Sequence, residues 1–460
     1  MEGNIFQQEV FIDVPHNDFD LGFNNRLTCA IGSLIPTAWY LCMPGDRFDI
    51  RTTINVQTVP LMSPAYANLR VYNATFAVPI RLLWNEFETF ISPENPNATP
   101  VVHPYVDLKS PVAPGDIGDY LGIPVNVTPA SGKGHVSALP GRAYAKIFNE
   151  WFRDENVQPV GIATTQGSGV DAITDYRAAP AQVLWRKDYF ASALPSPQFG
   201  APAVASLNSG GTGTEVEEIR RANALQRWLE RASAVGHRYI EAIFGHFGVR
   251  SSDARLQRPE LIGYNSAPLR IDTVLQTSQT SNEDTPTGTR YGTMNSSCQF
   301  MLDDGSFYCE EHMIIMNLMF IRPEADYVQG LAKEWKLFDR MDWPWPEFAK
   351  LGDEEIKNHE IYWQGQTADD AGFGYSQRYA WTKYHKNEVH GLFLSSLNHW
   401  TMPRKFSALP GLNLNFLQVS KNADDNIFAF AAQTADHYLV NVDHVVNANR
   451  PLPAFGMPTL

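Results

Sequence analysis

The chain has 460 residues, of which 44% are hydrophobic and 12% aromatic, so it can bury a large core and is not a disordered protein. It carries 36 basic and 50 acidic residues, a formal net charge of -14, and no run of basic residues, which excludes coating of nucleic acid by bulk electrostatics. The four cysteines lack C-x-x-C spacing, the first ten residues lack a secretion signal, and no apolar stretch approaches about eighteen residues. We therefore expect a soluble chain made in a reducing cytoplasm.

Strands are predicted throughout the first eighty residues. Residues 26–42 are apolar with β-branched side chains, and the turn Pro44-Gly45-Asp46 ends that run. Residues 48–59 then alternate apolar and polar side chains, and residues 69–78 have the same character before Pro79. Because a period of two is typical of half-buried strands, we expect strand, turn, strand and then a third strand.

A helical period replaces the strand period after residue 80. Residues 81–91 carry apolar side chains at helical spacing, and residues 142–154 predict a second short helix that is rich in aromatics. Residues 92–140, between these helices, are dense in Pro and Gly. Such a composition is typical of an ordered connection that runs over the surface.

A longer helix is predicted after a flexible, glycine-rich loop at residues 199–213. Thr214 and Glu217 form a capping box, and apolar side chains recur at helical spacing until Gly236. A second helical piece ends near Gly248. The middle of the chain is therefore expected to be helical and rich in loops.

Strand signals return from residue 299. Residues 300–302 and 307–321 flank the turn sequence Asp-Asp-Gly-Ser at residues 303–306, which predicts a hairpin. Further short strands are expected at residues 391–397 and 427–442. Strands at both ends of the chain around a helical middle indicate a β barrel or sandwich with large insertions.

Motifs for catalysis or for a bound cofactor are weak in this sequence. The glycine-rich loop lacks both the third glycine and the preceding strand of a phosphate-binding fingerprint. The G-x-S-x-G pattern of a nucleophile elbow is absent. We predict neither catalytic residues nor a cofactor, and the chain is expected not to be an enzyme.

A metal site is not expected either. His385, Glu388 and His390 are the nearest approach to a metal motif, but their spacing matches neither H-E-x-x-H nor H-x-x-E-H, and solvated side chains are the better interpretation. Acidic residues cluster at residues 369–370 and 424–425, where we expect exposed loops. Adjacent carboxylates in a loop do not supply the separation that glycosidase chemistry needs.

Aromatic and basic side chains interleave near residue 380. Arg378, Tyr379 and Lys383 belong to a run that can stack bases and neutralise phosphates of single-stranded DNA, although alternation between core and surface explains the same pattern. Arg404 and Lys405 are adjacent basic residues and form a second DNA-facing candidate. A surface salt bridge is the alternative interpretation of that pair.

Ordered motifs along nearly the whole chain resemble the major capsid proteins of the Microviridae, and most of all those of the gokushovirus-like branch. The motifs are Pro44-Gly45-Asp46-x-Phe48, Pro60-Leu61, Phe76-x-Val78-Pro79-x-Arg81-Leu82-Leu83-Trp84, Asn149-Glu150-Trp151-Phe152-Arg153-Asp154, Asp188-Tyr189-Phe190-x-Ser192-Ala193-Leu194-Pro195-x-Pro197-Gln198, Asp253-Ala254-Arg255-Leu256-Gln257-Arg258-Pro259-Glu260, Gln377-Arg378-Tyr379-Ala380 with Lys383-Tyr384, and Arg450-Pro451-Leu452-Pro453 with Gly456-Met457-Pro458. The order of these motifs, more than any single one, carries the resemblance.

The resemblance implies a mainly β fold: one eight-stranded antiparallel jelly roll over residues 1–460 with long, partly helical insertion loops. Residues 81–290 would then be mainly insertions, and residues 291–460 would hold the returning strands, loops and C-terminal tail. One departure is the short segment at residues 199–213, where gokushovirus-like relatives usually carry a long variable insertion. A prominent surface protrusion is therefore not expected.

The resemblance also implies a function and its partners. Copies of the chain would assemble in the host bacterial cytoplasm into a small T=1 icosahedral shell around circular single-stranded DNA. The implied partners are an internal scaffolding protein, a small basic DNA-binding protein, a DNA pilot protein, the packaged DNA and a host surface receptor. A carbohydrate-binding jelly-roll module is the alternative, because lectins share this architecture and use exposed aromatics.

Contacts between subunits are expected to depend on aromatic anchors in loops. Obligate interfaces typically bury roughly 2,000 Å² or more, and Trp is enriched among the residues that dominate their binding energy. The candidates are Trp84, Trp151, Trp343 and Trp345. The rigid segment Trp343-Pro344-Trp345-Pro346 suits either an intersubunit contact or a brace within the chain.

Overall fold

The structure is a computed structural model. It describes residues 14–59, 61, 66, 68–93, 99–130, 132–158, 160–198, 216–235, 239–250, 252–269, 272–275, 290–294, 296–301, 306–429 and 436–455. Within these ranges the chain is mainly antiparallel β, as the sequence predicts. No helix in the described ranges combines the length and the apolar character that a membrane span requires.

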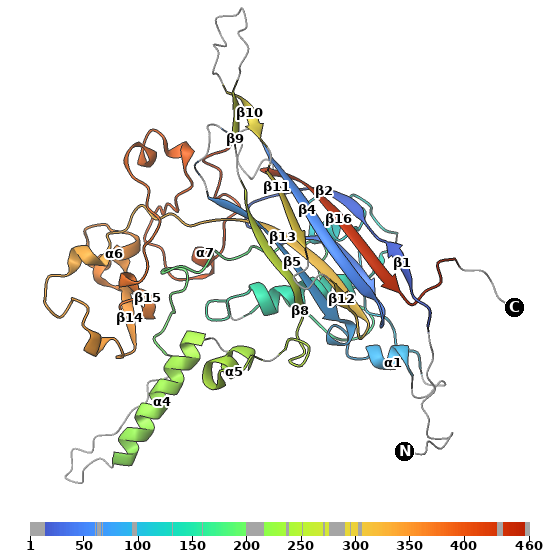
Figure 1. Ribbon diagram of the computed structural model, residues 1–460, viewed down its shortest axis with the longest axis horizontal. Helices are drawn as coiled ribbons and strands as arrows, with labels where there is room; N and C mark the ends of the chain where they lie inside the picture. Colours follow the sequence, from blue (N-terminus) through green and yellow to red (C-terminus); the bar gives the residue numbers. More distant parts are fainter. Residues whose placement is uncertain are drawn as a thin grey trace, which may run out of the picture.

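Two antiparallel sheets pack face to face at the centre of the molecule (Figure 1). The first sheet contains β1 (Asn17–Asp20), β2 (Phe23–Cys29), β4 (Arg47–Thr58), β11 (Ser296–Met301), β12 (Phe307–Tyr308) and β16 (Tyr438–Arg450). β1 and β2 pair with successive parts of β16, and β11 and β12 pair with successive parts of β4. The first sheet is therefore four strand positions wide, with β16 and β4 at its centre.

The second sheet has the order β3–β13–β5–β8. Its strands are β3 (Ile35–Cys42), β5 (Leu69–Pro79), β8 (Glu260–Leu269) and β13 (Met313–Pro323). In the described parts of the chain, three two-stranded sheets lie outside the sandwich: β6 (Tyr105–Asp107) with β7 (His135–Ser137), β9 (Asp272–Leu275) with β10 (Arg290–Met294), and β14 (Asp353–Lys357) with β15 (Gly372–Gln377).

The two sheets differ in how they are covered. β4 and β16 alternate buried and exposed side chains, so the first sheet has one buried face. β5 and β13 are buried along almost their whole length, so the second sheet is covered on both faces. Ile315 of β13 packs with Ile50 and Val446 between the sheets. The opposite face of the second sheet meets the first insertion.

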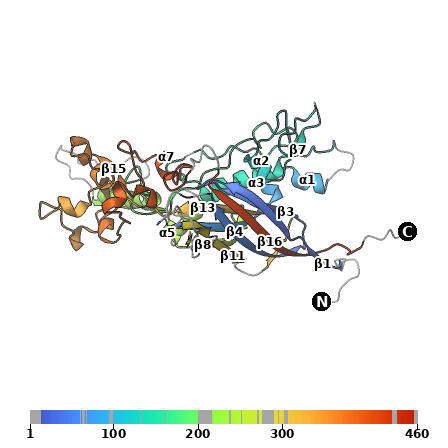
Figure 2. The same cartoon turned by 90° about the horizontal axis from the view of Figure 1, so that it is seen from above.

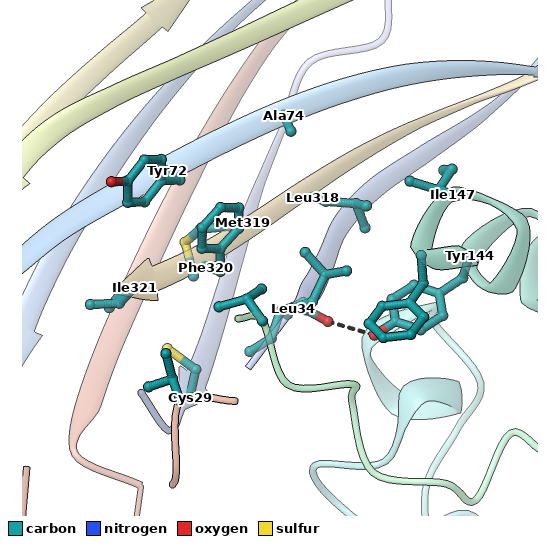
Figure 3. Packing of buried hydrophobic residues seen from close by; sticks show 14 of the residues in the cluster. Cys29, Leu34, Tyr72, Ala74, Tyr144, Ile147, Leu318, Met319, Phe320 and Ile321 are labelled. Atoms are coloured by element: carbon teal, nitrogen blue, oxygen red, sulfur yellow. Dashed lines mark hydrogen bonds between the residues drawn. The ribbon is translucent and has the colours of Figure 1, made fainter. Parts of the chain in front are cut away.

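The first insertion, residues 80–198, covers that outer face (Figure 2). Its helical elements are η2 (Ile80–Leu82), α1 (Phe87–Ile91), α2 (Ile117–Tyr120), α3 (Leu139–Ile147) and the π-helical turn η3 (Phe148–Phe152). Figure 3 shows Tyr144 and Ile147 of α3 beside Leu318 of β13. The Tyr144 hydroxyl donates a hydrogen bond of 2.9 Å to the carbonyl oxygen of Leu34. The insertion is thus part of the core.

Helices α4 (Val216–Val235) and α5 (Tyr239–Phe247) follow and contact each other. The second insertion, residues 324–437, extends away from the sandwich at the end opposite the chain termini (Figure 1). Its elements, besides β14 and β15, are η4 (Lys333–Lys336), η5 (Pro346–Phe348), α6 (Asn358–Ile361), η6 (Thr367–Asp370), η7 (Ala380–Thr382), η8 (Gly391–Leu394), η9 (Asn398–Trp400) and α7 (Leu414–Leu417).

Strand pairing corrects one prediction. The expected hairpin of residues 300–302 with 307–321 does not form, because β11 and β12 both pair with β4 while β13 belongs to the other sheet. The chain crosses between sheets at Cys309, which exchanges backbone hydrogen bonds with Gly45 and Asp46. Turn chemistry signals a reversal but not the sheet that the next strand joins. The turn residues 302–305 lie outside the described residues.

Other elements differ in their bounds or type. Residues 26–42 form the end of β2 and then β3, separated by residues 30–34, and residues 81–91 form two short helical pieces instead of one helix. The strand expected at residues 391–397 is instead the 3-10 helix η8, where Leu392 is 63% exposed. Within the described part of the chain, no strand pairs with that segment. The strand expected from residue 427 begins at Tyr438. The loop at residues 199–213 and its cap at Thr214 lie outside the described residues.

Candidate functional site

Trp84 lies in the interior of the subunit, directly after η2. Its side chain is fully buried, and its indole nitrogen donates a hydrogen bond of 2.7 Å to Oγ of Ser168. The ring packs beside Phe90 and His103, with centroid distances of 4.9 and 5.3 Å. Trp84 is therefore enclosed by its own chain and is not available as a surface anchor.

Trp151 is half-buried at the outer face of the second sheet. Its indole nitrogen donates to the carbonyl oxygen of Pro259 at 3.0 Å, and the Arg258 guanidinium lies 4.1 Å from the centre of the ring. These contacts join η3 to the segment that precedes β8. The sequence motifs that contain Trp151 and Arg258 are thus brought together by the fold, and the contact is internal.

Trp343 and Trp345 lie on the surface of the second insertion, with exposed fractions of 56% and 45%. The Trp345 indole donates to the carbonyl oxygen of Arg340 at 2.8 Å, so it also braces its own turn. The surrounding segment, residues 335–363, carries further exposed apolar side chains: Trp335, Phe338, Met341, Leu351 and Trp363. We call this segment the exposed aromatic segment. Exposed apolar side chains at this density mark interaction surfaces.

Arg378 and Tyr379 do not present a free basic and aromatic pair. Tyr379 is buried, has a left-handed backbone with φ of 59°, and its backbone nitrogen donates to Oε2 of Glu354 at 3.0 Å. Arg378 is half-buried, with its guanidinium 5.5 Å from the Tyr379 ring centre. A positive φ is uncommon outside glycine, so this turn is held in place by its contacts.

Lys383 is exposed and lines a cleft of about 910 Å³ between the second sheet and the second insertion. The lining of the cleft includes the basic residues Arg153, Arg186, Lys187 and Arg322, several aromatic residues such as Trp151, Tyr264 and Tyr384, and the acidic residues Asp154, Glu155, Asp188, Glu241 and Asp353. Part of the charge is already paired, since Arg186 lies 3.6 Å from Glu324 and Lys187 lies 3.7 Å from Asp154. Sequence reasoning missed Arg186 and Lys187, although they interleave with aromatics as residues 378–386 do.

Arg404 and Lys405, adjacent in sequence, have opposite environments. The Arg404 guanidinium is buried among aromatic rings, 4.2 Å from the Phe416 ring centre and 4.7 Å from that of Trp185. It donates to the Tyr327 hydroxyl at 3.1 Å and to the carbonyl oxygen of Phe416. The groups that Arg404 contacts therefore lie inside its own subunit. Lys405 is exposed.

His385, Glu388 and His390 do not converge on one point. His390 Nε2 lies 3.2 Å from Oε2 of Glu388, whereas His385 Nδ1 contacts the carbonyl oxygen of Lys386 at 3.1 Å. A different group brings metal-ligating atoms together: among the described residues, Asp424, Asp425 and His437 meet this condition. The expectation of exposed loops was wrong for Asp369 and Asp424, which are both buried.

Sequence comparisons define the class of protein as a viral capsid protein. The chain is 27% identical to capsid protein VP1 of Bdellovibrio phage phiMH2K, with 99% of this chain and 98% of that protein covered. It is 26% identical to capsid protein VP1 of Chlamydia phage 1, covering 99% and 98%, and 28% identical to capsid protein VP1 of Spiroplasma virus 4, covering 98% and 95%.

The chain belongs to the family described as capsid protein (F protein), whose profile it matches over residues 12–211 and 202–460. The resemblance to Microviridae major capsid proteins is thereby confirmed. The family is one of structural proteins of the virion. The function of this chain is therefore sought in the surfaces it presents to other molecules.

Proposed function

We propose that this capsid protein self-assembles into a small T=1 icosahedral shell that encloses a circular single-stranded DNA genome, and that it has no enzymatic role. The observation that carries the proposal is the family match across both parts of the chain. Three capsid proteins VP1 are also similar over at least 98% of this chain. A similarity of that extent includes the insertions as well as the sandwich.

The order of the strands supports a jelly roll as the scaffold of the shell. The eight principal strands in chain order are β2, β3, β4, β5, β8, β11, β13 and β16. Except for the step from β5 to β8, successive strands alternate between the two sheets. Two four-stranded sheets connected in this way are the arrangement of double-sheet jelly rolls, an architecture that viral capsid domains use.

The exposed aromatic segment is the surface that we assign to contacts between subunits. Trp343 and Trp345 are more than two-fifths exposed and stand on a proline-rigidified turn, so little conformational entropy is lost when a partner covers them. Aromatic anchors surrounded by polar residues are typical of the centres of interfaces. Trp84 and Trp151 contribute to assembly only indirectly, because their contacts lie within the subunit and stabilise its fold.

Contact with the packaged DNA is assigned to Lys383 and Lys405, together with the half-buried Arg378. Both lysines are exposed, and aromatic rings of the cleft lie close to Lys383 in the fold. The net charge of -14 means that the chain cannot neutralise a genome by itself. A small basic DNA-binding protein would supply the missing positive charge.

The remaining partners follow from the family role. An internal scaffolding protein would position subunits during assembly in the host cytoplasm, a DNA pilot protein would accompany the genome, and a host surface receptor would bind the outside of the particle. Exposed side chains such as Trp335 and Trp363 also suit the alternative function, binding of carbohydrate. A lectin of this size would remain a monomer or a small oligomer.

Electron microscopy of the purified full-length protein tests the proposal. The protein is expressed alone and together with the scaffolding protein of the same genome. Closed isometric particles of uniform size in either preparation are expected. Monomers or small oligomers in both preparations would contradict the shell, and binding to a glycan array by those species would favour the carbohydrate-binding alternative.

A further inference from the structure

Residues 421–429 form a turn that packs on the beginning of β16 and buries an acidic side chain there. Asp424 is fully buried, and its Oδ1 lies 2.9 Å from Nδ1 of His437, which is also fully buried. On the other side of the imidazole, Nε2 lies 3.8 Å from Oδ1 of Asp425, whose side chain is 30% exposed. His437 is therefore held between two carboxylates, and Phe428 covers its ring at a centroid distance of 4.2 Å.

A second buried polar group lies beside this carboxylate. Oδ2 of Asp424 and the Tyr438 hydroxyl are both buried, and the two side chains interact with each other. A charge in a buried site is costly, and proteins compensate such a charge by pairing it or by coordinating a metal.

The three side chains have the spacing of metal ligands. One donor atom from each of Asp424, Asp425 and His437 lies within 4.8 Å of the other two. Two atoms that share a tetrahedral Zn²⁺ at its usual bond lengths lie about 3.3 Å apart. The 3.8 Å separation of Nε2 and Oδ1 would have to shrink by about half an ångström. Asp425 can make this movement because it lies partly exposed on a turn.

The hydrogen bond from His437 to Asp424 is also typical of metal sites. A metal-bound imidazole usually donates its other ring N–H to a carboxylate, which fixes the ring and makes it a stronger ligand. Here Asp424 already holds Nδ1, and this leaves Nε2 directed toward Asp425. The exposed side of Asp425 gives an ion a route of entry and gives water access to the remaining coordination positions.

We propose that Asp424, Asp425 and His437 form a binding site for a divalent transition-metal cation such as Zn²⁺. His437 and Asp425 ligate the ion, and Asp424 orients the imidazole and contributes buried negative charge. An imidazole in the ligand set favours first-row transition metals over Mg²⁺ and Ca²⁺, which prefer oxygen ligands alone. The ion ties the end of the second insertion to β16, the central strand of the first sheet.

The test uses the full-length protein after removal of metal with a chelator. Zn²⁺ is added, excess ion is removed by desalting, and bound zinc is counted by mass spectrometry. We expect about one ion per chain and a rise in the thermal unfolding temperature, because a ligand that binds the folded state stabilises it. Ca²⁺ at the same concentration should produce neither effect.

Two variants and one matched control complete the experiment. Asp425→Asn and His437→Gln should each weaken zinc binding about tenfold or more. His390→Gln removes an exposed imidazole that also lies beside a carboxylate, Glu388, and should leave zinc binding unchanged. Asp425 is partly exposed, so its substitution tests the site even if the His437 variant does not fold.

Three outcomes would overturn the site. Wild-type protein could retain no more zinc than the variants, or the His390 control could lose as much as they do. Alternatively, Asp425→Asn could lower stability equally with and without zinc, which would identify the group as an ion pair of protonated His437. The measurement does not depend on particle formation, so its result is separate from that of the assembly experiment.

Discussion

Arg142 and Asp171 form an ion pair that is sealed inside the first insertion. Nε of Arg142 lies 2.8 Å from Oδ2 of Asp171, and the two side chains are 2% and 0% exposed. The guanidinium also donates to the carbonyl oxygens of Leu83 and Gly167, each at 3.0 Å. Asp171 accepts from the backbone nitrogen and the hydroxyl of Thr174. Arg142 therefore ties α3 both to Asp171 and, through Leu83, to the segment that follows β5.

Arg142→Met is expected to lower the free energy of unfolding by about 3–5 kcal/mol, because it leaves the Asp171 carboxylate buried without its partner. Denaturant titration of the full-length protein measures the loss. Arg177→Met is the control, since its pair with Asp175 is about half exposed and should contribute less than about 1 kcal/mol. Equal losses in the two variants would contradict the assignment.

The same pair predicts an acid-dependent loss of stability. Burial by itself would raise the pKa of Asp171, but hydrogen bonds from Thr174 and Arg142 lower it below the ordinary value. A carboxyl with a lowered folded-state pKa stabilises the protein above its unfolded pKa and loses that contribution as the pH falls. The stability difference between wild type and Asp171→Asn should therefore shrink as the pH decreases below about 4. A difference that is constant from pH 7 to pH 3 would contradict this prediction.

His444 predicts a second pH effect, at higher pH. Burial in β16 lowers its pKa to about 4, and its contacts there are the Thr52 hydroxyl at 3.3 Å and the ring of Phe23. An unfolded histidine has a pKa near 6.5, so the unfolded state takes up the proton first as the pH falls from about 6.5 to 4. Stability should decline across that window in the wild type. His444→Leu should remove this part of the decline in denaturant titrations at a series of pH values.

Arg404 and Lys405 should respond differently to substitution. Arg404→Lys removes a guanidinium that bonds Tyr327 and Phe416, and we expect it to lower stability by about 2 kcal/mol or more while leaving DNA binding unchanged. Lys405→Gln and Lys383→Gln should leave stability unchanged. Each lysine substitution should lower the slope of log affinity for single-stranded DNA against log salt by about 0.7 if one phosphate contact is lost. A salt slope that changes only in the Arg404 variant would reverse this assignment.

The tryptophans should separate folding from assembly. Trp343→Ala combined with Trp345→Ala should abolish particles in electron micrographs while changing the stability of the free subunit by less than about 1 kcal/mol. Trp84→Ala should instead cost about 3–5 kcal/mol in the subunit, because a buried indole is removed. Particles that form normally from the double variant would exclude the exposed aromatic segment as an essential interface.

Local periodicity was sufficient to predict several elements. β4 alternates along its whole length because one face of the first sheet is covered, and β5 precedes Pro79 as expected. α4 and α5 also occur where the helical spacing placed them. Strand pairing was not predictable in the same way. The partner of β12 is β4, about 260 residues earlier, and no turn signal near residue 303 carries that information.

The same limit applies to the candidate sites. Arg404 and Lys405 are indistinguishable in sequence, and only the fold brings Trp185, Tyr327 and Phe416 around the first of them. Asp424 was expected in an exposed loop as part of the acidic pair at residues 424–425. In the fold, the buried Asp424 side chain is hydrogen-bonded to His437, thirteen positions later in the sequence. Burial of a polar residue depends on distant partners, so sequence patterns identify candidate types more readily than their environments.

The position of β16 constrains how this protein can be synthesised. β16 follows the other described strands in chain order, yet it lies between the N-terminal strands and β4, and Asn17 bonds Leu452 across 435 positions of sequence. Strands β1 and β2 therefore wait for their partner until residues 438–450 have been synthesised. Contacts of such long range form slowly, and the waiting chain is prone to aggregate or to need a chaperone. A premature stop codon before residue 438 would remove the centre of a sheet, and the product would be a chain that cannot fold, not a shorter shell protein.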